Sequence, residues 1–354
     1  MLKQLLSHDL PRNKLLTAVL LVILFGLAFA PFLFPGAKAL NVAAKILIFI
    51  VLVASYDLLL GYTGIVSFAH TMFFGIGAYG IAIASTRMGA GWGSLLVGAL
   101  CAVVLSLVLS LIIGLFSLRV RAIFYAMITL AVASAFQTLA SQLSQFTGGE
   151  DGLNFKLPEL LSPAFQLAEE QVLGAWLDGK FITYYILFFT TVLLFLAMLR
   201  IVNSPFGRVL QAIRENDFRA EAIGYKIVVF RTLSNVLAAI FATLAGCMLA
   251  IWLRYNGPDT SLSFEIMVDI LLIVVIGGMG TMYGAICGSA IFLLAQNYLQ
   301  DLMRIAAGAA QNLPLLPALL SPDRWLLWLG ILFILSVYFF PTGIVGKLRT
   351  WGTR

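Results

Sequence analysis

Residues 181–226 read FITYYILFFTTVLLFLAMLRIVNSPFGRVLQAIRENDFRAEAIGYK, and their character changes at residue 203. Residues 181–202 form an almost unbroken apolar run, and about 20 such residues cross a bilayer as a helix. Residues 203–226 carry seven of the 38 charged residues in the chain. The stretch therefore predicts a membrane-spanning helix followed by a polar connector.

Apolar runs of this length recur along the 354-residue chain, which is 61% hydrophobic and 11% charged. Soluble domains carry about a quarter charged residues. A bilayer requires backbone groups to be satisfied internally, and the short alternating segments of a barrel are absent. The composition predicts an all-α, polytopic transmembrane helical bundle that forms a single domain over residues 1–354. We expect about ten spans, near residues 15–34, 40–60, 68–87, 94–118, 122–144, 181–202, 232–253, 266–280, 283–300 and 324–341.

The distribution of charge predicts which loops lie inside. With the N-terminus in the cytoplasm, the inner segments, counting Arg200, hold 14 Lys and Arg against 4 Asp and Glu. The outer segments, counting Arg87 and Arg324 at span ends, hold 7 against 10. Cytoplasmic loops carry the excess of basic residues, so we expect cytoplasmic N- and C-termini, an outer loop at 145–180 and a cytoplasmic segment at 203–231. The net charge of +6 is too dispersed to suggest nucleic acid.

Catalytic and metal-binding patterns are missing from the sequence. There is no Ser–His–Asp order, no metal-ligand spacing and no pair of carboxylates placed for acid–base chemistry, so we predict neither an enzyme nor a metal site. Cys101, Cys247 and Cys287 all lie in apolar segments. Free cysteines in such places behave as small hydrophobes, and we expect all three to be buried.

Two glycine-rich breaks separate predicted spans without a polar loop. The first reads GYTGIVSFAHTMFFGIGAYG (61–80) and the second reads GGMGTMYGAICGSA (277–290). Each begins with Gly-x-x-Gly and continues into a helix rich in small residues. Interrupted helices surround the substrate pathway in many transporters, whereas tight turns and close helix packing explain the same glycines structurally. Both interpretations stay open at this point.

Several polar residues lie in or beside these predicted spans. A carboxylate in the membrane is costly and indicates function by default. Asp57 lies near a span end, where it could simply reach interfacial water. Asp269 lies deeper, where it could meet the amino group of a substrate or bond a neighbouring side chain. A lone His70 is more often a packing residue than a ligand. The candidate pathway residues are Asp57, Gly61, Thr63, Gly64, Ser67, His70, Asp269, Gly277 and Gly280.

The connector at 203–226 has the signals of a well-formed helix. Ser204 can cap its start, with Pro205 at the first helical position, and Gly224 can end it in a left-handed turn. We expect one helix of about 18 residues, near 27 Å long. Its imperfect apolar stripe comprises Phe206, Val209, Leu210, Ile213, Ala220 and Ile223, and Glu215 and Arg219 can pair at i, i+4. It can lie on the membrane surface, act as a solvated link or dock a cytosolic partner.

The connector closely resembles the coupling segment of permeases in branched-chain amino acid ABC importers. That family shows SPFGRALRAIRENE-x-AEALG, and this chain has SPFGRVLQAIRENDFRAEAIG at 204–224. The resemblance continues through GYTGIVSFAHTMFFGIGAYG (61–80), TGGEDGL (147–153) and IVVIGGMGTMYGAICGS (273–289), and it covers nearly all of residues 40–300 in order. It departs at Asp57, where family members usually have Asn.

The resemblance implies a permease in a bacterial inner membrane that binds no ATP itself. The chain has no G-x-x-x-x-G-K-[S/T] sequence, so ATP would be bound by two separate subunits. A second, related permease, a periplasmic substrate-binding protein and the lipid bilayer would be the other partners. The connector would dock an ATP-binding subunit and relay its closure as a rigid body. The expected coupling residues are Phe206, Gly207, Arg208, Leu210, Ile213, Arg214, Glu215, Arg219, Glu221 and Gly224.

Three other functions stay open in the sequence. An importer of urea or short amides would use the same permease family, because the binding protein largely sets specificity. A stand-alone carrier would use an ion gradient through Asp57 or Asp269 and would need no ATP. A membrane enzyme has the least support, since no catalytic set is present. We expect an importer of branched-chain or related amino acids that carries out no chemistry on its substrate.

Overall fold

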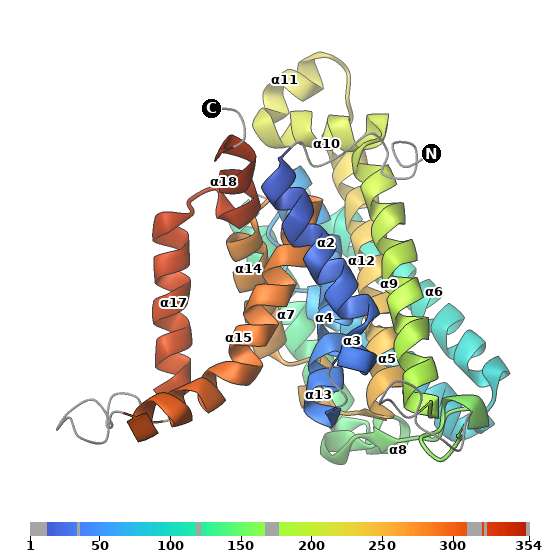
Figure 1. The fold of residues 1–354 in the computed structure, drawn as a ribbon. Helices are drawn as coiled ribbons and strands as arrows, with labels where there is room; N and C mark the ends of the chain where they lie inside the picture. Colours follow the sequence, from blue (N-terminus) through green and yellow to red (C-terminus); the bar gives the residue numbers. More distant parts are fainter. Residues whose placement is uncertain are drawn as a thin grey trace.

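The chain folds into a bundle of long helices (Figure 1), seen in a computed structural model that describes residues 13–33, 36–117, 122–166, 177–309, 321 and 324–351. The helices are α2 (Lys14–Ala28), α3 (Ala30–Leu33), α4 (Ala37–Thr63), α5 (His70–Met88), α6 (Trp92–Ser117), α7 (Ala122–Gln142), α8 (Ser144–Thr147), α9 (Gly179–Val202), α10 (Pro205–Glu215), α11 (Asp217–Ala222), α12 (Ile227–Leu253), α13 (Pro258–Ser261), α14 (Phe264–Gly277), α15 (Met282–Ala309), α17 (Trp325–Phe339) and α18 (Gly343–Trp351). The remaining elements are the 3-10 turns η1 (Gly149–Asp151) and η2 (Glu159–Leu161) and the strands β1 (Leu153–Asn154) and β2 (Tyr255–Asn256).

An all-α, polytopic membrane bundle is confirmed, but with fewer spans than predicted. Eight helical segments of the described chain are long and apolar enough to cross a membrane. The predicted first span is the shorter helix α2, with 15 residues. The predicted span at 68–87 is α5, which is absent from those eight. Because α5 packs against α6, α7 and α12 inside the protein, it needs no apolar surface for lipid.

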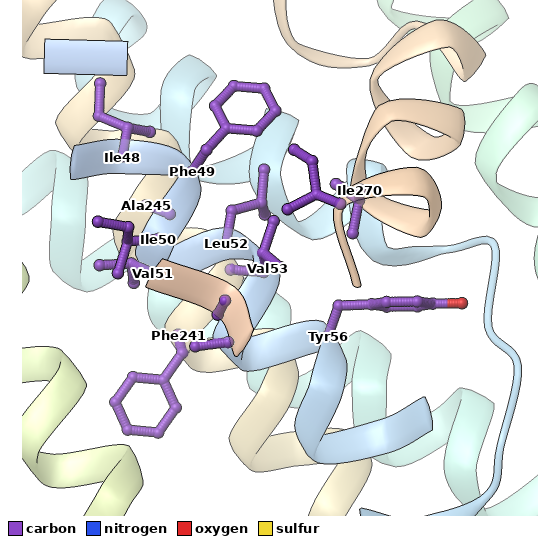
Figure 2. Close-up of a cluster of buried hydrophobic side chains, with 14 of the residues drawn as sticks. Ile48, Phe49, Ile50, Val51, Leu52, Val53, Tyr56, Phe241, Ala245 and Ile270 are labelled. Atoms are coloured by element: carbon purple, nitrogen blue, oxygen red, sulfur yellow. The ribbon is translucent and has the colours of Figure 1, made fainter. Parts of the chain in front are cut away.

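Helix α4 is the centre of the bundle. In its most apolar 18-residue window, 94% of the residues are buried. Figure 2 shows side chains from Ile48 to Tyr56 on α4 packed with Phe241 and Ala245 of α12 and Ile270 of α14. Helices α9 and α15 also contact α4. A helix enclosed on all sides must be apolar all round, which explains why α4 shows no clear amphipathic stripe.

The two ends of the bundle differ in character. Helices α10, α11 and α18 lie at one end, which we call the α10 end, together with the start of α2 (Figure 1). Asn13, at the start of α2, donates a hydrogen bond to the carbonyl of Leu348 in α18. The α8 end carries α8, α13 and the antiparallel pair of β1 with β2. The first and last described helices therefore meet on one side, as the charge distribution predicts. Part of the predicted outer loop, at 167–176, lies outside the described residues.

The connection from α4 to α5 turns back into the bundle. Residues 64–69 are not helical, and Ile65, Ser67 and Ala69 within them are buried. His70, the first residue of α5, has Nε2 2.8 Å from the hydroxyl of Ser55. Ser55 lies eight residues before the end of α4, so α5 starts about 12 Å below that end. Non-helical backbone at membrane depth must be covered by protein, and the N–H of Phe68 finds an acceptor in Thr129 Oγ1 at 3.0 Å.

Candidate functional site

The connector begins as the sequence predicts. Ser204 caps α10 by accepting a hydrogen bond from the N–H of Gly207 at 3.5 Å, and Pro205 takes the first helical position. Gly224 has φ of +96°, the left-handed conformation that favours glycine. The segment lies across the α10 end of the bundle (Figure 1), as a connector between α9 and α12.

The predicted single helix is wrong, because Asn216 divides it into α10 and α11. Asn216 is extended, with φ of −159° and ψ of 103°, and its side chain accepts a hydrogen bond from the N–H of Arg219. It therefore caps a second helix, a role for which asparagine is well suited. The predicted pair of Glu215 with Arg219 is not among the ion pairs of the described residues, and Arg231 binds Asp217 instead at 2.8 Å.

Helix α10 packs on the hydrophobic core of the bundle. Leu210 and Ile213 are completely buried, and α10 contacts α4, α9 and α12. The ring of Phe206 stacks on that of Phe230 in α12 at a centroid distance of 5.8 Å. These three residues were predicted as apolar contacts for a partner. Their burial corrects this for Leu210 and Ile213, which hold α10 to its own chain.

Arg214 of α10 remains exposed, but its guanidinium reaches the end of α4. Its Nη1 donates a hydrogen bond to the carbonyl oxygen of Gly61, near the end of α4. Its aliphatic part lies over Gly64, where an added Cβ would stand 3.2 Å from Arg214 Cγ. Gly64 ends α4 with φ of +73°. Arg214 was predicted to face a partner, whereas its guanidinium contacts the first glycine break.

Asp57 and Gly280 join the second glycine break to the same place. The N–H of Gly280 donates to Oδ1 of Asp57 at 2.9 Å. Asp57 is only 2% exposed, which corrects the alternative that it reaches interfacial water. Its Oδ2 is buried and has no hydrogen-bond partner among the residues that the structure describes.

The glycines are needed because two main chains meet here beside the side chains of Asp57 and Arg214. A Cβ on Gly61 would overlap the Asp57 carboxylate and the backbone nitrogen of Gly280. A Cβ on Gly280 would stand 2.8 Å from Arg214 Nη1 and 2.9 Å from the carbonyl oxygen of Gly61. We call the set Asp57, Gly61, Gly64, Arg214 and Gly280 the junction. It links the connector directly to both glycine breaks.

The other candidate pathway residues lie outside the junction. Thr63 bonds Leu58 and Ser234 within the core, and His70 contacts Ser55. Ser67 is buried, and Gly277 packs closely on Gly284. Asp269 is half-buried and accepts a hydrogen bond from Gln296 at 3.2 Å. It lies eight residues before the end of α14, about 12 Å along the helix.

The outer surface of the connector combines exposed charge with exposed apolar rings. Phe218 is 86% exposed and Ile223 is 72% exposed. Ile223 was predicted on the apolar stripe of a single helix, and after the break at Asn216 it is exposed. Phe218 was not among the predicted contact residues, although the Asn-Asp pair before it is a helix-start signal that predicts the break. The exposed predicted coupling residues are Arg208, Arg214, Glu215, Arg219, Glu221 and Gly224.

The hydrogen bonds of the junction join α10 to the end of α4, and α4 to the turn after α14. Among the described residues, no group of three or more His, Cys, Asp or Glu side chains could hold a metal ion. The polar atoms at the junction bind backbone groups of neighbouring elements. A displacement of α10 would therefore act on the ends of α4 and α14 directly.

Comparison with known proteins places these features in context. The sequence profile of the family described as "Branched-chain amino acid transport system / permease component" matches residues 38–337. The chain is 24% identical to the high-affinity branched-chain amino acid transport system permease protein LivM of Salmonella typhimurium, over 82% of this chain and 69% of that protein. It is 25% identical to the Escherichia coli protein of the same name, over 79% and 68%. A probable branched-chain amino acid transport permease protein LivM of Methanocaldococcus jannaschii is 25% identical, over 72% and 69%. No solved structure matches the chain significantly.

Proposed function

Because the chain belongs to the family of permease components of branched-chain amino acid transport systems, we propose that it is the membrane-spanning subunit of an ATP-driven importer. In this proposal two ATP-binding subunits, a second related permease and a periplasmic substrate-binding protein complete the system. The chain lies in the inner membrane of a bacterium, with the α10 end in the cytoplasm. The substrate is leucine, isoleucine, valine or a related amino acid.

The exposed face of the connector carries this proposal. It presents the ring of Phe218 and the side chain of Ile223 beside exposed charged residues. Buried apolar anchors in a polar surround are what protein interfaces use for affinity. Leu210 and Ile213 hold the same element firmly on the bundle. The segment therefore has one face for a partner and one face for its own chain, as a coupling element requires.

The junction supplies a route for the motion. Closure of the ATP-binding subunits would displace α10, and the contacts of Arg214 would transmit this displacement to Gly61 and Gly64. The contact of Asp57 with Gly280 brings the end of α14 into the same movement. Rigid elements that shift against one another are a common means of switching a transporter between its two open states.

Co-purification with the candidate ATP-binding subunits tests the proposal. Phe218→Asp places a charge in the proposed interface but alters no internal contact, so we expect loss of the ATP-binding subunits with normal membrane insertion. Leu160→Asp is the matched control, because it charges a 44% exposed leucine in η2. Equal retention of the subunits by both variants would contradict docking at the connector.

Uptake in vesicles distinguishes the substrates and the energy source. ATP-dependent uptake of labelled leucine in the complete system, unaffected by excess urea, is the expected result. Uptake of leucine by this chain alone, driven by an ion gradient and lost in Asp269→Asn, would instead support a secondary carrier. Competition by urea would point to the short-amide variant of the importer.

A further inference from the structure

An apolar groove lies between α5, α6 and α7, away from the junction. Its volume is about 550 Å³, within the usual range for small-molecule sites. The walls come from large side chains on three helices, including Ile83, Leu105, Phe136 and Leu139. Tyr79, Arg87 and Thr147 contribute the polar atoms to a lining that is otherwise apolar.

Small residues explain why the groove exists. Gly80 and Ala84 of α5 meet Gly98 and Ala102 of α6 so closely that a Cβ on Gly98 would stand 2.5 Å from the carbonyl oxygen of Gly80. Small residues at such spacing allow helix backbones to approach in membranes. They also leave no side chains to fill the floor next to the large residues of α7. The same close packing that joins α5 to α6 therefore leaves the groove open beside them.

The length of the groove matches one leaflet of a bilayer. It reaches along α5 from Ile76 to Met88, which is about 18 Å at 1.5 Å per residue. The hydrocarbon core of a bilayer is about 30 Å thick. Arg87 lies in the last turn of α5, at the α8 end. With the α8 end at the membrane surface, a groove of this length would reach to about the middle of the bilayer.

Arg87 places positive charge where the groove meets the surface. Of the described residues that line the groove, Arg87 alone carries a charge. Its Nη2 donates to the carbonyl of Gln145 at 3.2 Å, and its guanidinium carbon lies 4.5 Å from the centre of the Phe146 ring. These contacts fix the side chain but leave it exposed. A guanidinium offers five donors and matches the geometry of a phosphate.

We propose that this groove binds one acyl chain of an anionic phospholipid, with the lipid phosphate at Arg87. The apolar walls cannot satisfy the ammonium and carboxylate of an amino acid, so the groove is not a site for the transported substrate. The surface that suits a partner subunit lies on α4, α14 and α15, where polar side chains occur at membrane depth. Lys45 is exposed in the span of α4, and half-buried Asp269 and Gln296 lie on α14 and α15. Charged groups at membrane depth face protein or water, whereas apolar surface tolerates lipid.

Photo-crosslinking in vesicles tests the site with the assembled transport system. The probes are phosphatidylglycerol and phosphatidylcholine that carry the same photoreactive group in the acyl chain. We expect crosslinks on the peptides at 76–105 and 136–147, with phosphatidylglycerol favoured about fivefold, the preference that one basic residue gives at an anionic surface. Arg87→Gln should remove the preference, whereas Lys156→Gln, an equal change of charge on an exposed residue at the α8 end, should keep it.

A second variant tests the groove separately from the charge. Cys101 lines the groove and is exposed, which corrects its predicted burial. Cys101→Phe should reduce crosslinking of both lipids there without forcing a buried contact. Equal labelling by the two lipids in the wild type, or labelling spread evenly over α6 and α9, would overturn the proposal. Absence of crosslinks from either lipid on these peptides in the assembled system would overturn it as well.

Discussion

The two glycine breaks share a sequence pattern but not a backbone path. After Thr63 the chain runs for six non-helical residues, 64–69, through the bundle, before α5 starts at His70. After Gly277 the four residues at 278–281 turn directly into α15. The first break inserts irregular backbone at membrane depth, whereas the second is a tight turn at the α10 end. Gly-x-x-Gly therefore does not indicate one type of turn.

What the two breaks share is a contact. Gly61 and Gly280 lie backbone to backbone, and Arg214 of α10 contacts both glycines. In each case glycine is needed because another main chain occupies the space of a Cβ. The difference between the breaks shows that the pattern marks a place of close approach. The structure then shows which elements approach one another.

Substitution of Gly61 should produce the largest effect. Gly61→Ala places a methyl group on the Asp57 carboxylate and on the backbone of Gly280, neither of which can move without separating the breaks. Overpacking of this kind costs about 1–3 kcal/mol or more in the free energy of unfolding. We expect a lower melting temperature in detergent and loss of uptake. Gly330→Ala in α17 is the control, since nothing lies within 4 Å of its added Cβ; equal loss in both variants would contradict the close contact.

Removal of the Arg214 side chain should come next. Arg214→Ala leaves the carbonyl of Gly61 without its donor, at a cost of about 1–3 kcal/mol. We expect uptake to fall more than stability, because the connection between α10 and the breaks is lost. ATP hydrolysis by the assembled system should continue without matching uptake. Arg208→Ala, on the exposed face of the same helix, should not uncouple the two rates in this way.

Gly64 distinguishes backbone conformation from close contact. Its φ of +73° makes a Cβ unfavourable by roughly 1–2 kcal/mol, but the added atom meets only the flexible side chain of Arg214. We expect Gly64→Ala to lower the melting temperature less than Gly61→Ala does. Gly64→Asn should recover part of the loss, because asparagine tolerates the left-handed region. If asparagine behaves like alanine, crowding by Arg214 dominates instead.

Asp57→Asn should have the smallest effect. The amide oxygen can still accept the hydrogen bond from Gly280, and the change removes a buried charge whose second oxygen has no described partner. We expect melting temperature and uptake close to those of the wild type. Asp57→Leu removes the acceptor and should destabilise the protein by about 1–3 kcal/mol. A loss of uptake in Asp57→Asn alone would show that the charge itself has a role, as an ion-coupled carrier requires.

Much of the fold could be predicted from the sequence because bilayer physics leaves few choices. Long apolar runs predict helices, and ten such runs correspond to ten long helices, of which eight are clear spans. Ten spans are not confirmed, because α2 is shorter than the eight and α5, which is enclosed by protein, needs no lipid-facing surface. The cap at Ser204 was correct because it depends on adjacent residues alone. The break at Asn216 was missed, although its cap is just as local.

The candidate site was predicted less well than the fold. The sequence singled out Asp57, Gly61, Gly280 and Arg214 separately, as pathway residues and as a partner contact. Nothing in their spacing indicated that they meet, since Arg214 lies 153 residues from Gly61. Leu210 and Ile213 were expected to face a partner because an apolar stripe does not reveal what covers it. The exposed ring of Phe218 could be recognised only after the buried side of the connector was known.

The sequence by itself determined that this protein is a helical membrane bundle with a charged connector and two glycine breaks. These features follow from local composition and from the cost of unsatisfied backbone in lipid, which act on each segment independently. Tertiary structure alone decided that the connector reaches the breaks through Arg214, that Asp57 joins them, and that a groove opens between α5 and α7. Those outcomes depend on which distant surfaces pack together, and only the folded chain brings those surfaces into contact.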